Sequence, residues 1–208
     1  AAVACSGQRC TAISRVVVLD SLVDEVTEAL AAELAAIRVG PAWDPQASMG
    51  PLITDQHRIS VLRNMAIGLD GDGLLRFGGR VLEEGELAHG HFLEPTLIDR
   101  VAPDKRLARE EVFGPVLTVV AVRDADQAFE VANSVEYGLA ASVFTRDVDE
   151  VLRFVRESET GMVHVNHGTA SEAHLPFGGV KGSGFGAYSI GHSNQEFFTT
   201  LKAVYFQS

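Results

Sequence analysis

The chain has 208 residues, of which 46% are hydrophobic and 22% charged, and this ordinary globular composition excludes disordered and fibrous proteins. Seventeen Lys and Arg against 28 Asp and Glu leave a net charge of −11, so we expect neither nucleic acid nor a membrane surface among its partners. Two cysteines cannot form a disulfide framework or, with these histidine spacings, a zinc site, and no apolar run approaches the roughly 18 residues of a membrane span. We therefore expect a cytoplasmic protein with reduced cysteines, no bound metal and no membrane segment.

Local patterns in the first half predict alternating strands and helices. Runs rich in β-branched residues predict strands, and apolar residues at 3.6-residue spacing predict helices. Thr54 is predicted to cap the second helix, because its hydroxyl can accept from a free backbone N–H. Strands are predicted at 14–19, 74–77 and 92–98, a first helix between 20 and 40, a loop over 40–53 and a second helix after Thr54.

The second half continues this alternation more regularly. Its β-α-β-α-β order with short turns favours parallel strands joined by right-handed crossovers. In the later helix Val148, Val151, Leu152 and Val155 are predicted to face inward, and a glycine-rich loop follows from residue 167 to about 194. We expect one α/β domain with a protruding terminal strand. Strands are predicted at 115–122, 140–145 and 161–166, and helices at 124–135 and 147–158.

Cys10 is a candidate nucleophile. A free thiol with a pKa of about 8.5 is only slightly ionised at neutral pH, so a reactive cysteine needs local help. Arg9 is adjacent, and the small polar residues before Cys10 suit a position early in a short helix, which also favours the thiolate. From spacing alone a buried structural role is the commoner alternative, and we assign that role to Cys5.

Four short segments resemble motifs of the aldehyde dehydrogenase superfamily, in the family's order. Residues 7–12 (Gly-Gln-Arg-Cys-Thr-Ala) are similar to its catalytic cysteine segment, and residues 110–116 (Glu-Glu-Val-Phe-Gly-Pro-Val) to its cofactor-contacting motif. Residues 176–184 (Pro-Phe-Gly-Gly-Val-Lys-Gly-Ser-Gly) resemble the glycine-rich segment below the substrate tunnel, and residues 49–53 (Met-Gly-Pro-Leu-Ile) are a looser match. The resemblance covers essentially the whole chain.

The resemblance implies oxidation of an aldehyde to a carboxylate. In that family a cysteine thiolate attacks the aldehyde, a hydride leaves to NAD or NADP, and water hydrolyses the resulting thioester. Cys10 matches the nucleophile, and its own backbone N–H matches half of the oxyanion hole.

Three residues match the family's cofactor site. Glu111 matches the carboxylate that accepts from the nicotinamide ribose, and Phe113 matches the aromatic residue beside the nicotinamide. His57 falls where the family more often has glutamine near the ribose, which is a departure. Without the resemblance, Glu111 would be interpreted as a solvated acid, Phe113 as a core residue and His57 as an exposed helix residue.

On the substrate side, Phe177 matches an aromatic residue of the tunnel, although core packing is its alternative role. Asn166 and the loop after it occupy the place of the family's specificity loop. Residues 186–192, which follow Phe185, depart from the Arg-Glu sequence common in the family and resemble semialdehyde-oxidising branches. A carboxylate-bearing substrate favours an arginine partner, so we place Arg9 and Thr11, the neighbours of Cys10, at the substrate.

The resemblance covers only the C-terminal part of the family's chain. It implies a catalytic domain at 1–198, with a mostly parallel sheet flanked by helices, and an oligomerisation strand at 199–208 of a homodimer or homotetramer. The cofactor-binding domain, the general-base glutamate and the asparagine of the oxyanion hole are expected upstream of Ala1, so we expect this chain alone to be inactive.

Two alternatives remain open. One is a CoA-acylating semialdehyde dehydrogenase, in which CoA rather than water takes the acyl group. The other is a non-catalytic module that keeps the fold for assembly.

Overall fold

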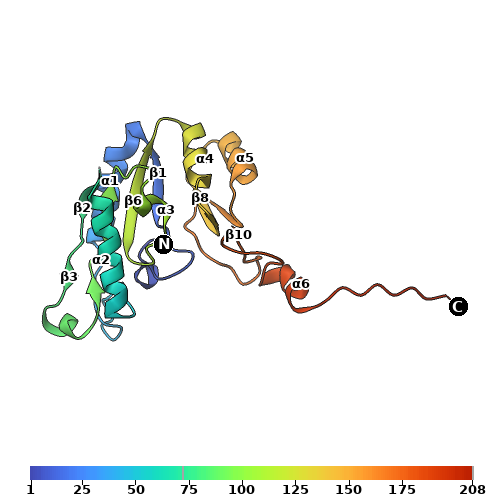
Figure 1. Ribbon diagram of the computed structural model, residues 1–208, viewed down its shortest axis with the longest axis horizontal. Coiled ribbons are helices and arrows are strands. Elements are labelled where there is room, and N and C mark those ends of the chain that lie inside the picture. The colour runs from blue at the N-terminus through green and yellow to red at the C-terminus, as the bar shows by residue number, and fades with distance from the viewer. Residues whose placement is uncertain (72, 208) are drawn as a thin grey trace. The chain divides into compact units, whose positions relative to one another are not determined.

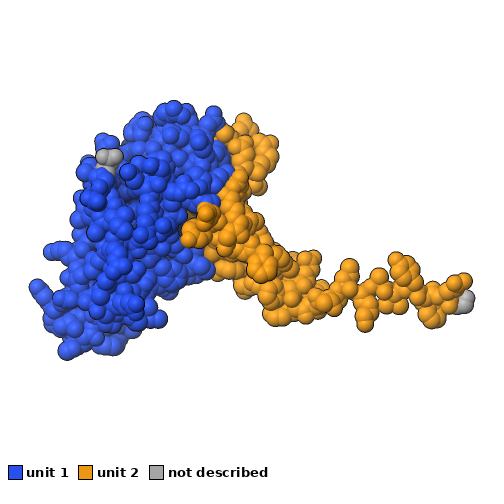
Figure 2. All heavy atoms as spheres, in the orientation of Figure 1, with its two compact units in different colours: residues 1–135 blue, residues 136–208 orange. Residues whose placement is uncertain are grey.

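The computed structural model describes residues 1–71 and 73–207 of the chain (Figure 1). These residues form two compact units, residues 1–135 and residues 136–208 (Figure 2). The predicted boundary between a catalytic domain and a terminal strand at residue 198 stays a prediction. Among the described residues, no helix is both long and apolar enough to cross a membrane.

Unit 1, residues 1–135, is an α/β unit whose elements follow the predicted alternation. In chain order they are the 3-10 helix η1 (Ala4–Gly7), β1 (Arg15–Leu19), the 3-10 helix η2 (Asp20–Leu22), α1 (Val23–Ala35), α2 (Asp55–Leu69), β2 (Leu74–Phe77), β3 (Val81–Leu82), the 3-10 helix η3 (Gly85–His89), β4 (Phe92–Leu93), β5 (Thr96–Asp99), α3 (Arg106–Arg109), β6 (Val116–Val122) and α4 (Ala125–Asn133).

A four-stranded sheet of order β1-β6-β5-β2 forms the centre of unit 1. β6 runs parallel to both β1 and β5, whereas β2 is antiparallel to β5 and closes one edge. The prediction of a mostly parallel sheet is therefore confirmed. A second, two-stranded pairing joins β3 to β4.

The central strand β6 is buried on both faces, because its side chains alternate between two apolar cores. Val116 and Val120 belong to one core, to which α2 contributes the fully buried Val61. Leu117 belongs to the other core, to which α1 contributes Leu34. α1 and α2 therefore cover opposite faces of the sheet, and the predicted flanking helices are confirmed.

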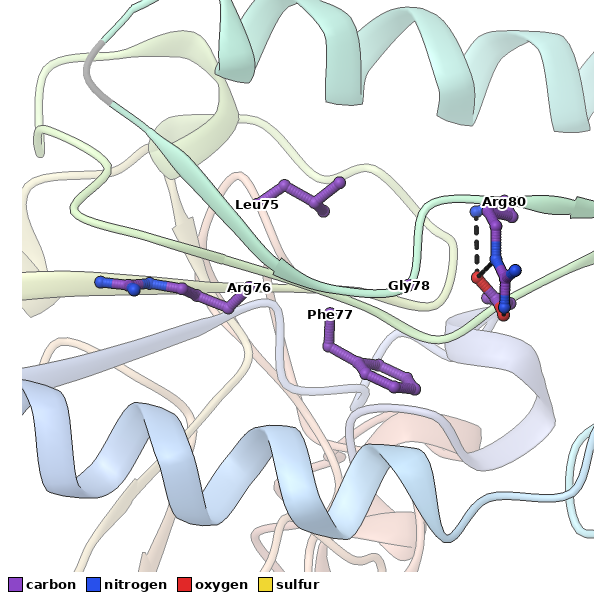
Figure 3. A pocket seen from close by; sticks show the side chains of 6 residues that line it. Leu75, Arg76, Phe77, Gly78 and Arg80 are labelled. Atoms are coloured by element: carbon purple, nitrogen blue, oxygen red, sulfur yellow. Dashed lines mark hydrogen bonds and ion pairs between the residues drawn. The ribbon is translucent and has the colours of Figure 1, made fainter.

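β2 is an edge strand with exposed apolar side chains. Leu74 and Leu75 are each 47% exposed. Along this edge a shallow hollow is lined by residues 75–78, Arg80 and Glu94, and Arg80 pairs with Glu94 at 2.6 Å (Figure 3). None of these lining residues belongs to the motifs that carry the family resemblance.

The described residues of unit 2, which spans residues 136–208, form short strands, two α-helices and a 3-10 helix. β8 and β9 pair in parallel and are joined through α5, as the sequence predicts. The predicted single β-α-β-α-β series is only partly right, because β8 and β9 form a two-stranded sheet of their own. The elements are β7 (Tyr137–Gly138), β8 (Ala140–Val143), α5 (Val148–Glu157), β9 (Met162–Val165), β10 (Val180–Lys181), the 3-10 helix η4 (Gly191–Ser193) and α6 (Asn194–Phe198).

The predicted inward face of α5 is wrong for three of its four residues, whereas the fourth, Val151, is half-buried. Val148, Leu152 and Val155 are each more than half exposed, and Phe154 is the buried residue of this helix. A period of 3.6 residues shows which side chains share a face, but α5 carries two apolar stripes and the period does not select between them.

The segment after α6 is extended and exposed. Residues 199–207 carry no helix or strand in the structure, and Leu201, Tyr205 and Phe206 are at least 91% exposed. Its assignment as an oligomerisation strand stays a prediction.

Candidate functional site

Cys10 lies in a turn between η1 and β1, and its side chain is exposed. The predicted short helix at Cys10 is wrong. η1 ends at Gly7, and Cys5 and Ser6 within it have φ of 50° and 59°, the left-handed region that an α-helix of L-residues avoids. Cys5 is also exposed, so the buried structural role predicted for it is wrong as well.

The loop before Cys10 is anchored to the segment 49–53. The Ser6 hydroxyl donates to the Gly50 carbonyl at 2.8 Å. The Gln8 side chain accepts from the backbone N–H of Ile53 at 3.0 Å and donates to the Pro51 carbonyl at 3.3 Å. Two of the motifs singled out in the sequence are thus connected by hydrogen bonds.

The same loop contacts the segment 110–116 through glycine. Gly7 has φ of 69°, and a Cβ at this position would overlap with the Gly114 carbonyl. At Gly114, a Cβ would lie 2.7 Å from Cγ2 of Val61 in α2. Glycine at both positions therefore allows the cysteine loop, the 110–116 segment and α2 to approach closely.

Glu111 follows the short helix α3. No hydrogen bond or ion pair of its carboxylate occurs among the described residues, whereas its neighbour Glu110 pairs with Arg106 at 2.6 Å. Glu111 keeps much of its surface in solvent, yet partial burial raises the pKa of its carboxyl. Its oxygens are therefore free to accept hydrogen bonds from a ligand.

Phe113 has φ of 54°, and its side chain is 39% exposed. A bulky residue in this region carries strain on the order of 1–3 kcal/mol that its surroundings must offset. Its carbonyl accepts a hydrogen bond from Nε2 of His57 at 2.7 Å, and the two rings meet edge to face with centroids 6.3 Å apart.

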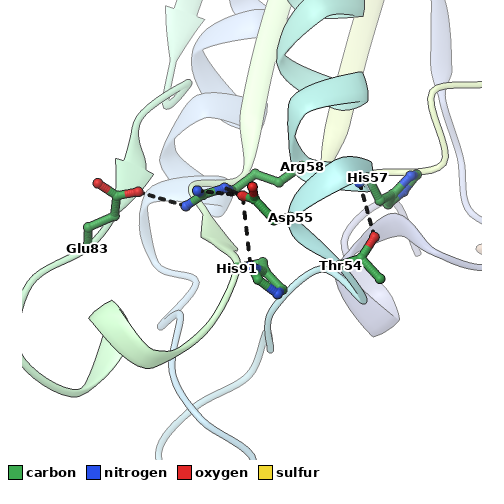
Figure 4. A network of polar contacts seen from close by, with 6 residues as sticks. All are labelled: Thr54, Asp55, His57, Arg58, Glu83 and His91. Atoms are coloured by element: carbon green, nitrogen blue, oxygen red, sulfur yellow. Dashed lines mark hydrogen bonds and ion pairs between the residues drawn. The ribbon is translucent and has the colours of Figure 1, made fainter.

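His57 is fixed at the start of α2. The Thr54 hydroxyl accepts from the His57 backbone N–H at 3.1 Å, which confirms the predicted helix cap (Figure 4). On another side of the same turn Arg58 pairs with Asp55 at 2.7 Å and with Glu83 at 2.9 Å. The first turn of α2 is therefore held by polar contacts on two sides.

The predicted substrate residues differ in their surroundings. Arg9 is exposed beside Cys10, whereas the Thr11 side chain is buried. Phe177 belongs to unit 2, where it is half-buried and exchanges two backbone hydrogen bonds with Ser189, at 2.7 and 3.0 Å.

Asn166 directly follows β9 and has a φ of 51°. Its side-chain amide accepts from the Thr145 N–H and donates to the Thr145 carbonyl, both at 2.9 Å. A shallow hollow in unit 2 is lined by residues 144–146 and Asn166. The amide of Asn166 therefore holds the loop after β8.

Within unit 1 the structure brings together the cysteine loop, the segments 49–53 and 110–116, and His57. The anchoring roles of Ser6 and Gln8 and the contact of His57 with a backbone carbonyl were not predicted from the sequence. The sequence signal that could have indicated the close approach of the two segments was a glycine in each motif, at Gly7 and Gly114. Among the described residues there is no group of three or more His, Cys, Asp or Glu side chains placed to hold a metal ion.

The family model of the aldehyde dehydrogenase family matches residues 1–204. The chain belongs to the aldehyde dehydrogenase family. The resemblance predicted from four motifs is thereby confirmed.

Two curated relatives act on semialdehydes. The alpha-ketoglutarate semialdehyde dehydrogenase of Haloferax volcanii is 41% identical over 202 residues, which are 96% of this chain and 42% of that protein. The NADP(+) succinate-semialdehyde dehydrogenase of Deinococcus radiodurans is 40% identical over 181 residues, covering 87% of this chain and 37% of that protein. This chain therefore spans about two fifths of the length of these aldehyde dehydrogenases.

The fold agrees with that of a solved family member. Betaine aldehyde dehydrogenase from Staphylococcus aureus, in complex with NAD+, superimposes with a TM-score of 0.89 at 32% identity. The match covers 93% of this chain and 38% of that one. The predicted aldehyde dehydrogenase fold is confirmed.

Proposed function

We propose that this chain is the nucleophile-bearing part of an NAD(P)+-dependent aldehyde dehydrogenase that oxidises an aldehyde to a carboxylate. The observation that carries the proposal is the close packing of the Cys10 loop against the segment that contains Glu111 and Phe113, through Gly7 and Gly114. A thiol for covalent catalysis and a group of residues suited to a dinucleotide thus belong to one unit.

Cys10 supplies the nucleophile in this proposal. Its thiolate attacks the aldehyde carbon, the C–S bond forms, and the negative charge moves to the carbonyl oxygen. In the part of the chain that the structure describes, the Cys10 backbone N–H makes no hydrogen bond, so it is free to donate to that oxygen. Such a donor typically contributes about 2.7–4 kcal/mol to the transition state.

The residues present fit a nicotinamide nucleotide. The unpaired carboxylate of Glu111 can accept from both hydroxyls of a ribose, and the exposed ring of Phe113 offers an apolar wall nearby in the chain. When bound, NAD(P)+ accepts the hydride that leaves the substrate carbon. Cys10 then holds the acyl group as a thioester until water releases the carboxylate.

A semialdehyde with its own carboxylate is the substrate class that we propose. The supporting observations are the two semialdehyde-oxidising relatives and the exposed side chain of Arg9, the residue before Cys10 in the sequence. We expect Arg9→Gln in the complete enzyme to raise KM for a semialdehyde and not for an uncharged aldehyde.

The test is reduction of NAD+ or NADP+ by the complete enzyme, followed by absorbance at the nicotinamide band and by product analysis. Cys10→Ser should abolish the reaction, and the product should be a free carboxylate. A requirement for CoA with an acyl-CoA product would establish the acylating alternative. Full activity of Cys10→Ser would overturn the proposal.

We further propose that residues 199–208, the last of which lies outside the described residues, hold a homo-oligomer together. An extended apolar segment whose side chains are exposed in the single chain is expected to pair with another strand. Deleting residues 199–208 from the complete protein should lower its mass in light scattering by a whole number of subunits. An unchanged mass would contradict the assignment.

We place the enzyme in the cytoplasm, because both exposed cysteines are free thiols and a reducing compartment keeps them so. Cell fractionation with the activity assay tests this location.

A further inference from the structure

The Phe113-Gly114 elbow has a conformation that the sequence does not favour by itself. Phe113 is a bulky residue with φ of 54°, and Gly114 is in backbone contact with the cysteine loop. Left-handed backbone at a non-glycine residue persists only when neighbouring groups impose it.

Helix α2 supplies contacts to both residues of the elbow. Nε2 of His57 lies 2.7 Å from the Phe113 carbonyl oxygen, and Val61, one turn later on the same face, fills the space beside Gly114. His57 is itself fixed, because Thr54 caps its backbone N–H. The carbonyl of Phe113 is thus tied to the rigid start of a helix that is 15 residues long.

We propose that His57 is a positioning residue, which donates its Nε2–H to the Phe113 carbonyl and holds the elbow in the shape that presents the Phe113 ring and supports the Cys10 loop. This inference rests on the proposed function and deepens it. His57 would act on the site indirectly, by holding the backbone carbonyl of Phe113. Its Nε2, the ring nitrogen farther from the helix, binds this carbonyl and not a ligand.

Variants of His57 that keep an N–H donor at the position of Nε2 should hold the elbow, and variants that lose this donor should not. His57→Gln places an amide N–H at about the distance of Nε2 from the helix, whereas His57→Asn is one bond shorter and His57→Ala has no donor. His89→Ala is the matched control, because His89 is an exposed histidine outside the site in η3.

Hydrogen exchange measured by mass spectrometry reports the elbow directly, without any substrate. In the complete protein, the peptide covering residues 110–117 should exchange faster in His57→Ala and His57→Asn than in the wild type. In His57→Gln and His89→Ala it should exchange as in the wild type. Peptides from β5 should not change in any variant.

Cofactor kinetics give a second readout. Loss of one neutral hydrogen bond typically changes an equilibrium about 2- to 10-fold, so KM for the nucleotide should rise by that factor in His57→Ala and His57→Asn. His57→Gln should recover most of this loss.

Two results would overturn the assignment. One is unchanged exchange of residues 110–117 in His57→Ala, and the other is a His57→Gln variant as impaired as His57→Ala. If the proposed function is wrong but the His57 assignment is right, the results differ from these. Cys10→Ser then keeps its activity, while hydrogen exchange of residues 110–117 still increases in His57→Ala.

Discussion

Gly7 and Gly114 meet backbone to backbone, with no room for a Cβ on Gly7. The contact joins the loop that carries Cys10 to the segment that carries Glu111 and Phe113. Any side chain at residue 7 must displace one of these two segments. The candidate nucleophile and the candidate cofactor residues are therefore mechanically coupled.

Gly7→Ala should destabilise the protein by at least about 2 kcal/mol, from the positive φ of 69° together with the overlap with Gly114. For a chain of this size that corresponds to a fall of roughly 4–8 °C in the unfolding midpoint, measured by circular dichroism. Gly50→Ala is the control, because a Cβ at Gly50 has nothing within 4 Å. Equal midpoints for the two variants would contradict the coupling.

Glu111→Gln should impair use of the nucleotide while the thiol stays reactive. An amide offers one acceptor oxygen where the carboxylate offers two, and loss of a charged hydrogen bond costs about 1.5–3 kcal/mol. We expect kcat/KM for the nucleotide to fall by about 10- to 100-fold in the complete enzyme, with an unchanged rate of Cys10 alkylation. Unchanged kinetics would show that Glu111 is only a surface acid.

Limited iodoacetamide at pH 7 should label Cys10 before Cys5. Both thiols are exposed, so accessibility does not decide between them. Cys10 lies in the segment that resembles the family's catalytic cysteine segment, whereas Cys5 lies before it. Mass spectrometry of the peptides identifies the modified residue, and preferential labelling of Cys5 would refute the assignment of the nucleophile.

His164 in β9 should make the stability of the protein depend on pH. Its Nδ1 is buried without a hydrogen-bond partner among the described residues, and Nε2 lies 3.2 Å from the Ala170 carbonyl. Burial, and then the charge of His167, lower the pKa of His164 below the ordinary 6.5. The unfolded chain therefore binds this proton at a higher pH than the folded chain does.

It follows that the free energy of unfolding should fall as the pH drops from about 7 through 6.5 toward the lower pKa of the folded state. His164→Gln keeps an amide donor for the Ala170 carbonyl but does not titrate. Its unfolding midpoint should therefore fall less than that of the wild type between pH 7.5 and 5.5, which is roughly the range in which an ordinary histidine titrates. His192→Gln, at an exposed histidine, should follow the wild type. Parallel curves for all three proteins would contradict this role of His164.

Much of the fold could be predicted because its signals are local. β6 is apolar at every position except Thr118, a pattern typical of a strand buried on both faces, and Thr54 is a common N-cap residue. The inward face of α5 could not be predicted, because Leu152 and Phe154 are both apolar and only tertiary packing decides which of them is buried.

In the candidate site, too, some features could be predicted from local sequence, whereas others depend on contacts between distant residues. Short motifs singled out Cys10 as the nucleophile and Phe113 as a cofactor-contacting residue, and both side chains are exposed in the structure. The left-handed backbone of Ser6 was not predictable, because serine has no preference for that region. The contact of His57 with Phe113 spans 56 residues of sequence, and no local pattern indicates a partner at that distance.

The left-handed turn before Cys10 also has a consequence for the order of folding. Its conformation depends on Gly50, which is 44 residues from Ser6, and on Gly114, which is farther still along the chain. A growing polypeptide leaves the ribosome with its N-terminal side first, and contacts between distant residues form late. Cys10 is therefore made before the segments that shape its loop, so the loop around this thiol is first organised when the sheet of unit 1 is already assembled.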